Sequence, residues 1–133
     1  MSLFDSITET AIVSLVDRFY GKARRDPIIG PVFNAAVEDW DGHLAKLHDF
    51  WSSVMLTTGR YKGNPMAAHM KQPIEPGFFD RWLDLWRETA AEVFAPELAA
   101  QFALKAERIA ESLKLALFYR PDRIPIRSAA ETA

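Results

Sequence analysis

Hydrophobic positions recur every three or four residues along most of the chain, which is the period of an amphipathic helix. The first stripe follows Ser6 and Glu9, which have the spacing of a helix-capping box, and it stops at Asp26 and Pro27. Its apolar members are Ile12, Leu15, Val16, Phe19, Tyr20 and Ala23. This spacing predicts one long helix with a single buried face.

Three more long helices are expected. The second ends near Gly59, and its stripe is Trp40, His43, Leu44, Leu47, Phe50, Trp51, Val54 and Met55. The stripe of the third is Phe78, Phe79, Trp82, Leu83, Trp86, Ala90, Val93 and Phe94. The fourth runs from about Pro96 to Tyr119, and its inward positions are Leu98, Phe102, Ile109, Leu113, Ala116 and Leu117. A short helical turn is expected within "PIIGPVFNAA". Because no segment alternates like a strand, the predicted fold class is all-α.

The composition is that of one folded domain. The chain has 133 residues, of which 49% are hydrophobic and 12% aromatic, and this is enough to build a core. We expect a domain over residues 1–119. Residues 120–133 are polar and interrupted by prolines, so they are expected to be a disordered tail.

Charge and cysteine content exclude several classes of protein. Sixteen basic and eighteen acidic residues are spread along the chain, so neither nucleic acid nor an anionic membrane is an expected partner. Without cysteine there are no disulfides and no thiolate metal sites. The chain lacks a basic leader with an apolar segment and any apolar run of membrane-spanning length, so we expect a soluble, cytoplasmic protein.

The common catalytic motifs are missing. There is no GxGxxG, P-loop, GxSxG or HExxH, so a hydrolase or nucleotide-dependent enzyme is not indicated. His43 and His48 are five residues apart and point to different helix faces, which argues against a zinc site. We expect His48 at the surface and Trp40 and Trp86 in structural packing. The basic pair Arg24 and Arg25 suits the end of a helix and predicts nothing more.

The stretch "YKGNPMAAHMK" places a histidine in a short helical turn. Pro65 can open the turn and Pro73 follows it, while two methionines flank His69. Taken alone, this histidine is most simply structural or solvent-facing. An all-helical chain with two histidines, His43 and His69, and many aromatics also suits a porphyrin, which needs an imidazole for its iron and broad walls for its ring. Such aromatics can equally be plain core.

The order of the motifs is more specific than any one of them. "DRFYGKARRDPIIGPVFN", then "DGHLAKLHDFWSSVMLTTGRYKGNPMAAHM", then "FFDRWLDLW" resembles the truncated haemoglobins, in the third group of that family. The resemblance covers about residues 8 to 118, and the absence of any Gly-Gly pair fits the third group. It implies a two-over-two helical sandwich around a b-type haem, with the proximal helix reduced to a brief turn.

The resemblance also implies residue roles. His69 matches the proximal ligand to the haem iron, and Tyr20, His43 and Trp82 match side chains that face a bound ligand. The other positions expected to contact the cofactor are Phe33, Leu47, Phe50, Trp51, Tyr61, Met66, Ile109 and Leu113. The hydroxyl and cations available for the haem propionates are Tyr61, Lys46, Arg60, Lys62 and Lys71.

The expected function is therefore that of a haem protein that binds oxygen, nitric oxide and carbon monoxide. The resemblance leaves open whether it also detoxifies nitric oxide or has peroxidase-type activity, with an unknown reductase as partner. The alternative from a different class is a haem-free helical interaction module whose aromatics form only a core.

Overall fold

The computed structural model describes residues 3–63 and 74–118. The helices in these ranges are α1 (Glu9–Ala23), α2 (Gly30–Ala36), α3 (Trp40–Leu56), α5 (Pro76–Val93) and α6 (Pro96–Phe118). Over the same ranges there is no strand, and the one extended pairing is an isolated bridge between Phe4 and Phe94. The predicted all-α class is confirmed. The predicted tail over residues 120–133 lies outside the described residues.

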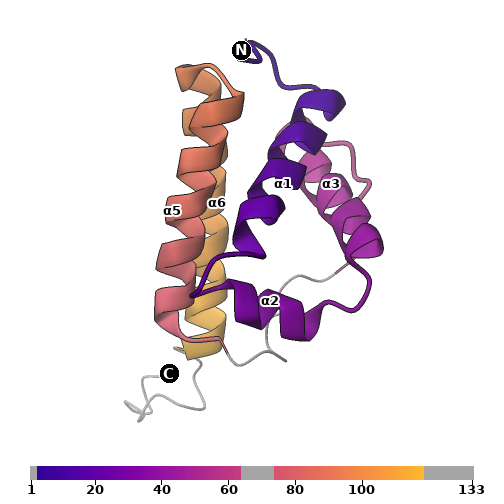
Figure 1. Ribbon diagram of the computed structural model, residues 1–133. Helices are drawn as coiled ribbons and strands as arrows, with labels where there is room; N and C mark the ends of the chain where they lie inside the picture. Colours follow the sequence, from indigo (N-terminus) through magenta and orange to yellow (C-terminus); the bar gives the residue numbers. More distant parts are fainter. Residues whose placement is uncertain (1–2, 64–73, 119–133) are drawn as a thin grey trace, which may run out of the picture.

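The long helices form two layers. Helix α5 packs along α6, and α1 packs on α5 and also on α3, so α1 joins the two layers. Figure 1 shows α5 and α6 as an antiparallel pair, with α1 and α3 beside them and the short α2 at one end. This is the predicted two-over-two arrangement. No helix in the described part of the chain has the length and apolarity to cross a bilayer.

The helix ends follow from local hydrogen bonding. The Thr8 side chain accepts a hydrogen bond from the backbone N–H of Ala11 at 3.1 Å and caps α1, so the predicted start at Ser6 is wrong by two residues. Asp39 caps α3 in the same way, at 3.2 Å from the N–H of Gly42. Helix α3 then ends at Leu56, a little before the predicted Gly59, because the next residue adopts a left-handed conformation.

The core combines aliphatic and aromatic side chains from all the long helices. The largest fully buried ones are Trp51, Trp86, Phe19, Phe94 and Phe102. The Trp86 indole N–H donates to the backbone carbonyl of Phe102 at 3.1 Å, which satisfies the polar atom of a side chain that has no solvent contact. The predicted packing role of Trp86 is confirmed.

Asp26 connects three helices. Its carboxylate lies between α1 and α2, accepts hydrogen bonds from the N–H groups of Ile28 and Ile29 at 2.9 and 3.0 Å, and pairs with Arg81 of α5 at 2.7 Å. Burial opposes ionisation of this group. The Arg81 guanidinium and the two N–H groups outweigh burial and hold the pKa of Asp26 below its usual value. The carboxylate thereby holds the α1–α2 turn against α5.

Glycine is required where α2 begins. A Cβ at Gly30 would lie 2.8 Å from the carbonyl oxygen of Arg24, closer than real side chains approach. The tight reversal between α1 and α2 therefore needs a residue without a side chain. This reversal brings Phe33 of α2 against Tyr20 of α1, with ring centroids 5.4 Å apart.

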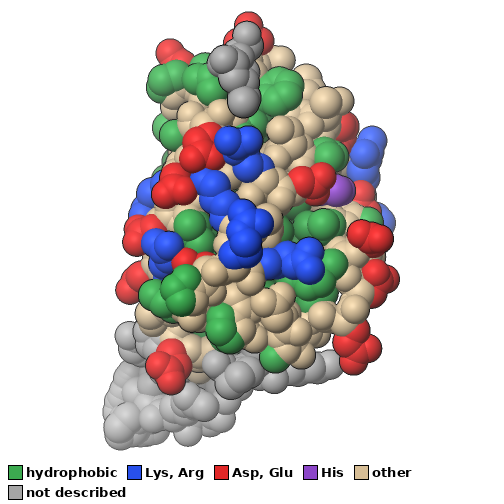
Figure 2. All heavy atoms as spheres, in the orientation of Figure 1, with side chains coloured by type: hydrophobic (Ala, Val, Ile, Leu, Met, Phe, Trp, Pro, Cys, Tyr) green, Lys and Arg blue, Asp and Glu red, His purple; other side chains and the backbone are tan. Residues whose placement is uncertain are grey.

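Charges on the face that carries α1 and α5 are largely paired. Figure 2 shows basic side chains in a band over the middle of this face, with acidic side chains on both sides of it. Arg18 pairs with Glu92 at 2.8 Å, and Lys22 pairs with Glu88 and Glu92 at 2.7 and 2.9 Å. These partly exposed pairs each contribute little to stability, and they leave no single-sign patch among these four residues.

Candidate functional site

A cavity of about 550 Å³ lies between the two helical layers. Its walls come from α1, α2, α3, α5, α6 and residues 60–63. The lining residues are Tyr20, Phe33, His43, Lys46, Leu47, Asp49, Phe50, Trp51, Arg60, Tyr61, Lys62, Gly63, Phe78, Phe79, Trp82, Ile109, Ala110 and Leu113. The cavity is thus mainly aromatic and aliphatic, with charged side chains confined to α3 and the segment after it.

The predicted site residues that fall within the described ranges all line this cavity. Those that line the cavity are Tyr20, Phe33, His43, Leu47, Phe50, Trp51, Tyr61, Trp82, Ile109 and Leu113. Their roles toward a cofactor or ligand stay predictions, because position in a wall does not establish a role. His69, Met66 and Lys71 lie outside the described residues.

Aromatic rings meet edge to face around the cavity. His43 lies against Tyr20 with ring centroids 6.0 Å apart and planes at 88°, and Phe50 lies against Tyr61 at 5.2 Å and 90°. Edge-to-face contacts fix ring orientation, because the positive edge of one ring meets the negative face of the other. The walls are therefore shaped before anything binds.

Tyr20 and Trp82 are the two polar donors that meet within this apolar wall. The Trp82 side chain is hydrogen-bonded to Tyr20, whose residue is 4% exposed. Burial raises the pKa of the Tyr20 hydroxyl well above its ordinary value, and the hydrogen bond with Trp82 opposes this only in part. Because an indole nitrogen can only donate, the Tyr20 oxygen is the acceptor and its O–H proton is directed elsewhere.

Cations lie at one edge of the cavity. Lys46 projects from α3, and Arg60 and Lys62 follow that helix. Arg60 also forms an ion pair with the Glu9 carboxylate at 3.4 Å. A flat group with apolar faces and carboxylates on one edge matches these walls, since the faces would contact the aromatics and the carboxylates the cations. The described residues therefore fit a haem.

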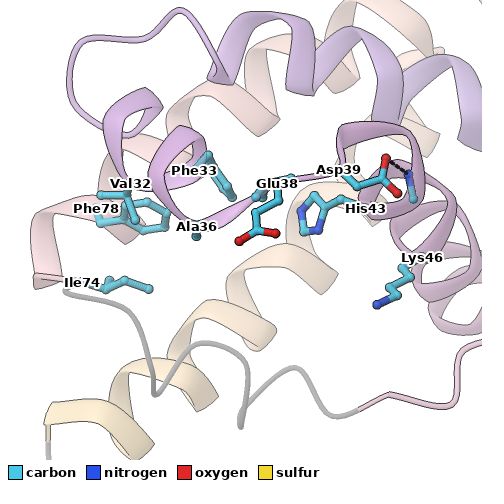
Figure 3. Close-up of a pocket in the computed structure, with 11 residues that line it drawn as sticks. Val32, Phe33, Ala36, Glu38, Asp39, His43, Lys46, Ile74 and Phe78 are labelled. Carbon is cyan, nitrogen blue, oxygen red and sulfur yellow. Dashed lines mark hydrogen bonds between the residues drawn. The ribbon is translucent and has the colours of Figure 1, made fainter.

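A second cavity of about 420 Å³ adjoins the first. It shares Phe33, His43, Lys46 and Phe78 with the first cavity, so these four residues lie between the two. Figure 3 shows the Glu38 carboxylate and the His43 ring projecting into it, beside the capping hydrogen bond of Asp39. His43 thus lies on the boundary between the two cavities.

Several lining residues were missed as site residues. Phe78 and Phe79 were expected only as helix-stripe positions, and Ala110 and Glu38 were not singled out. A helical stripe does not distinguish a residue that faces a cavity from one that faces the core. A single acidic residue such as Glu38 does not indicate a cavity position in the sequence, because its place depends on where α3 begins.

One minor prediction needs revision. The guanidinium of Arg24 lies 4.4 Å from the ring centroid of Trp40, so this arginine does more than favour the end of a helix. Trp40 in turn lies 5.4 Å from the His43 ring. His48 lies at the surface as predicted, with a partly exposed side chain that bonds to Asp17 of α1 at 2.8 Å.

Comparisons with known proteins agree with this geometry. The model of the bacterial-like globin family matches residues 2–114. A group 3 truncated haemoglobin of Campylobacter jejuni is 34% identical over 120 residues, which cover 86% of this chain and 94% of that protein. The crystal structure of a group III truncated haemoglobin from Campylobacter jejuni aligns with a TM-score of 0.84 at 33% identity, over 88% of this chain and 96% of that one. This chain therefore belongs to the bacterial-like globin family, as a truncated haemoglobin of group III, a class of haem proteins that bind ligands.

Proposed function

We propose that this protein binds haem b without a covalent link and holds its iron through His69. Family membership supports haem binding in general, and the absence of cysteine excludes thioether attachment through this chain. Leu47, Phe50 and Trp51 would contact the ring, and Lys46, Arg60 and Lys62 would receive the propionates. When bound, the haem supplies an iron that takes up diatomic ligands and changes oxidation state.

The pair formed by Tyr20 and Trp82 carries the proposal. These donors come from different helices and meet inside a wall that is otherwise apolar. Dioxygen would take up negative charge from a bound ferrous haem, so a hydroxyl proton aimed at that oxygen would stabilise it electrostatically. Tyr20 would donate this hydrogen bond, while Trp82 orients the hydroxyl and polarises it. His43 would supply a further donor from α3.

Oxygen, nitric oxide and carbon monoxide are the proposed ligands. The proposed second activity is catalytic reduction of peroxide or conversion of nitric oxide. Donors close to an O–O bond favour its cleavage, which suits peroxide reduction, and bound oxygen can also react with nitric oxide to give nitrate. An unidentified reductase would return the iron to its ferrous form. We place the protein in the cytoplasm, where such reductants are found.

A haem-free interaction module remains the contrasting proposal. The cavity favours haem, because a module whose aromatics served only as core would close its packing rather than leave about 550 Å³ open. The direct test is to purify the full chain, supply haem and record the absorption spectrum. A Soret band and release of the haem by acid-acetone are expected, and a folded protein without a Soret band would exclude the haem proposal.

The choice of iron ligand has its own test. His69→Ala is expected to abolish the normal ferrous spectrum while leaving helical circular dichroism largely intact. His48→Ala serves as the matched control, because His48 pairs with Asp17 away from the residues that line the cavity. Equal spectral changes in the two variants would show that His69 is the wrong ligand.

A further inference from the structure

We propose that three stacked tryptophans, Trp82, Trp86 and Trp51, donate an electron to the haem site during peroxide reduction. Trp82 and Trp86 are nearly parallel, at 8°, with ring centroids 5.8 Å apart. Trp86 and Trp51 are 4.5 Å apart at 21°. This inference rests on the proposed peroxide chemistry and adds a source for one of its electrons.

The stack starts and ends at the cavity. Trp82 of α5 and Trp51 of α3 both line it, while Trp86 lies between them in the core. Indole is among the most easily oxidised side chains, and face-to-face overlap lets neighbouring rings share the positive charge left by a lost electron. Three adjacent, near-parallel rings that reach the haem site are therefore a better electron source than any one of them alone.

Burial makes the loss of an electron reversible. Trp86 is 0% exposed and Trp51 is 1% exposed, so water has no direct route to attack either of these two rings once oxidised, whereas Trp82 is half-buried. The Trp86 N–H donates to the carbonyl oxygen of Phe102, which is too weak a base to remove the indole proton. The oxidised species is then a radical cation whose charge faces the negative end of a carbonyl dipole.

Phenols are the final reductant in the proposed reduction of peroxide. One hydrogen peroxide takes up two electrons and two protons, its O–O bond breaks, and two waters form. Two phenols supply these, each losing one electron and one proton to become a phenoxyl radical. Of the two electrons that the O–O bond takes up as it breaks, the stack would lend one and the haem site the other. The two phenols then return one electron to each, while the phenol protons reach the oxygen atoms through solvent.

The test is a search for the tryptophan radical in the full-length, haem-loaded ferric protein. The protein is mixed with hydrogen peroxide, frozen within milliseconds and studied by electron paramagnetic resonance. A parallel sample carries ring-deuterated tryptophan, which narrows the signal only if the radical lies on indole. A tryptophan radical is expected in the wild type, and it should be lost in Trp86→Phe because the remaining rings no longer stack.

Trp40→Phe is the matched control. Trp40 lies 6.1 Å from Tyr20 but has no ring contact with the stack among the described residues, so its removal should leave the radical in place. Trp51→Phe is the second variant in case Trp86→Phe does not fold, and it should weaken the signal. The carbon monoxide spectrum of each variant checks that the pocket is intact.

The outcomes separate this inference from the proposed function. If the haem spectrum responds to peroxide but the radical lies on tyrosine, is absent, or persists in both stack variants, the stack is not the donor. Loss of the radical in Trp40→Phe would also overturn it. If peroxide leaves the haem spectrum unchanged, the proposed peroxide chemistry and this inference fail together, while binding of diatomic ligands stands.

Discussion

The core and the cavity of this globin are both aromatic, yet they differ in what the rings contact. In the core, Phe94 stacks on Phe102 at 4.6 Å and both are fully buried. Around the cavity, Phe50 and Tyr61 meet edge to face, and both remain half-buried beside open space. The first region stabilises the fold by close packing. The second packs less closely and contributes less to stability, because its rings leave a preformed site open.

The largest expected effect is the loss of a core ring. Phe102→Ala should lower the free energy of unfolding by about 3 to 5 kcal/mol, because it removes buried contacts and leaves a void. Urea unfolding followed by circular dichroism measures this. Phe50→Ala should cost clearly less in the same experiment and should instead speed haem transfer to a scavenger protein. Similar unfolding energies for both variants would erase the distinction between the two regions.

The next effect concerns the polar pair within the cavity wall. Tyr20→Phe removes the proposed donor to bound oxygen, and a hydrogen bond to a charged partner contributes roughly 1.5 to 3 kcal/mol. Oxygen dissociation should therefore rise about 10- to 150-fold, while carbon monoxide dissociation changes much less. Trp82→Phe should have a smaller effect of the same kind, since its N–H is bonded to Tyr20.

Stopped-flow measurements with both gases test this pair. The Tyr20→Phe and Trp82→Phe double variant should be non-additive, because the two side chains form one hydrogen-bonded unit. Parallel changes for oxygen and carbon monoxide would mean that these residues shape the cavity by size alone.

A smaller effect is expected at the polar group that holds the helices around the cavity. The lowered pKa of Asp26 means that its stabilising contribution is complete above its unfolded-state pKa and is lost as pH falls through the folded-state pKa. Asp26→Asn should cost about 1 to 2 kcal/mol near neutral pH, because Arg81 is partly exposed and recovers some hydration. The difference between wild type and variant should shrink in acid. Urea unfolding at several pH values measures it, and a constant difference would contradict this account.

The smallest effect is expected at His48. Its bond to Asp17 joins α3 to α1 at a partly exposed position, so His48→Ala should change the free energy of unfolding by less than about 1 kcal/mol. Both the Soret band and the oxygen dissociation rate should remain those of the wild type. A large change in either would place His48 in contact with the site after all.

The fold was largely predictable because hydrophobic residues repeat with the helical period along each long helix. The stripes containing Phe19, Trp86 and Phe102 specify which face of each helix is buried, and those faces meet in the structure. The start of α1 was misplaced because Ser6 and Thr8 both offer capping oxygens, and only the backbone path selects between them. Helix ends depend on such local choices more than on the stripe.

The site was predictable through resemblance, and its remaining members were hidden for a physical reason. Phe78 and Ala110 share their stripes with core residues, so hydrophobic periodicity cannot separate them from the core. Glu38 and the Arg24–Trp40 contact depend on how α2 leads into α3, which pairs residues from different segments. Such pairings arise from tertiary packing and leave no local pattern.

The bridge near the chain start has a consequence for the order of folding. Phe4 donates its N–H to the carbonyl of Val93 at 2.8 Å and accepts from the N–H of Ala95 at 2.9 Å. Its ring also lies 5.9 Å from that of Phe94. Closing a loop of this length costs entropy that two hydrogen bonds do not recover by themselves, so we expect α1 to pack on α5 before this bridge forms. We therefore expect the amide protons of Phe4 and Ala95 to be the last to gain protection from hydrogen exchange. The time at which they do so during refolding would report when the native state is complete.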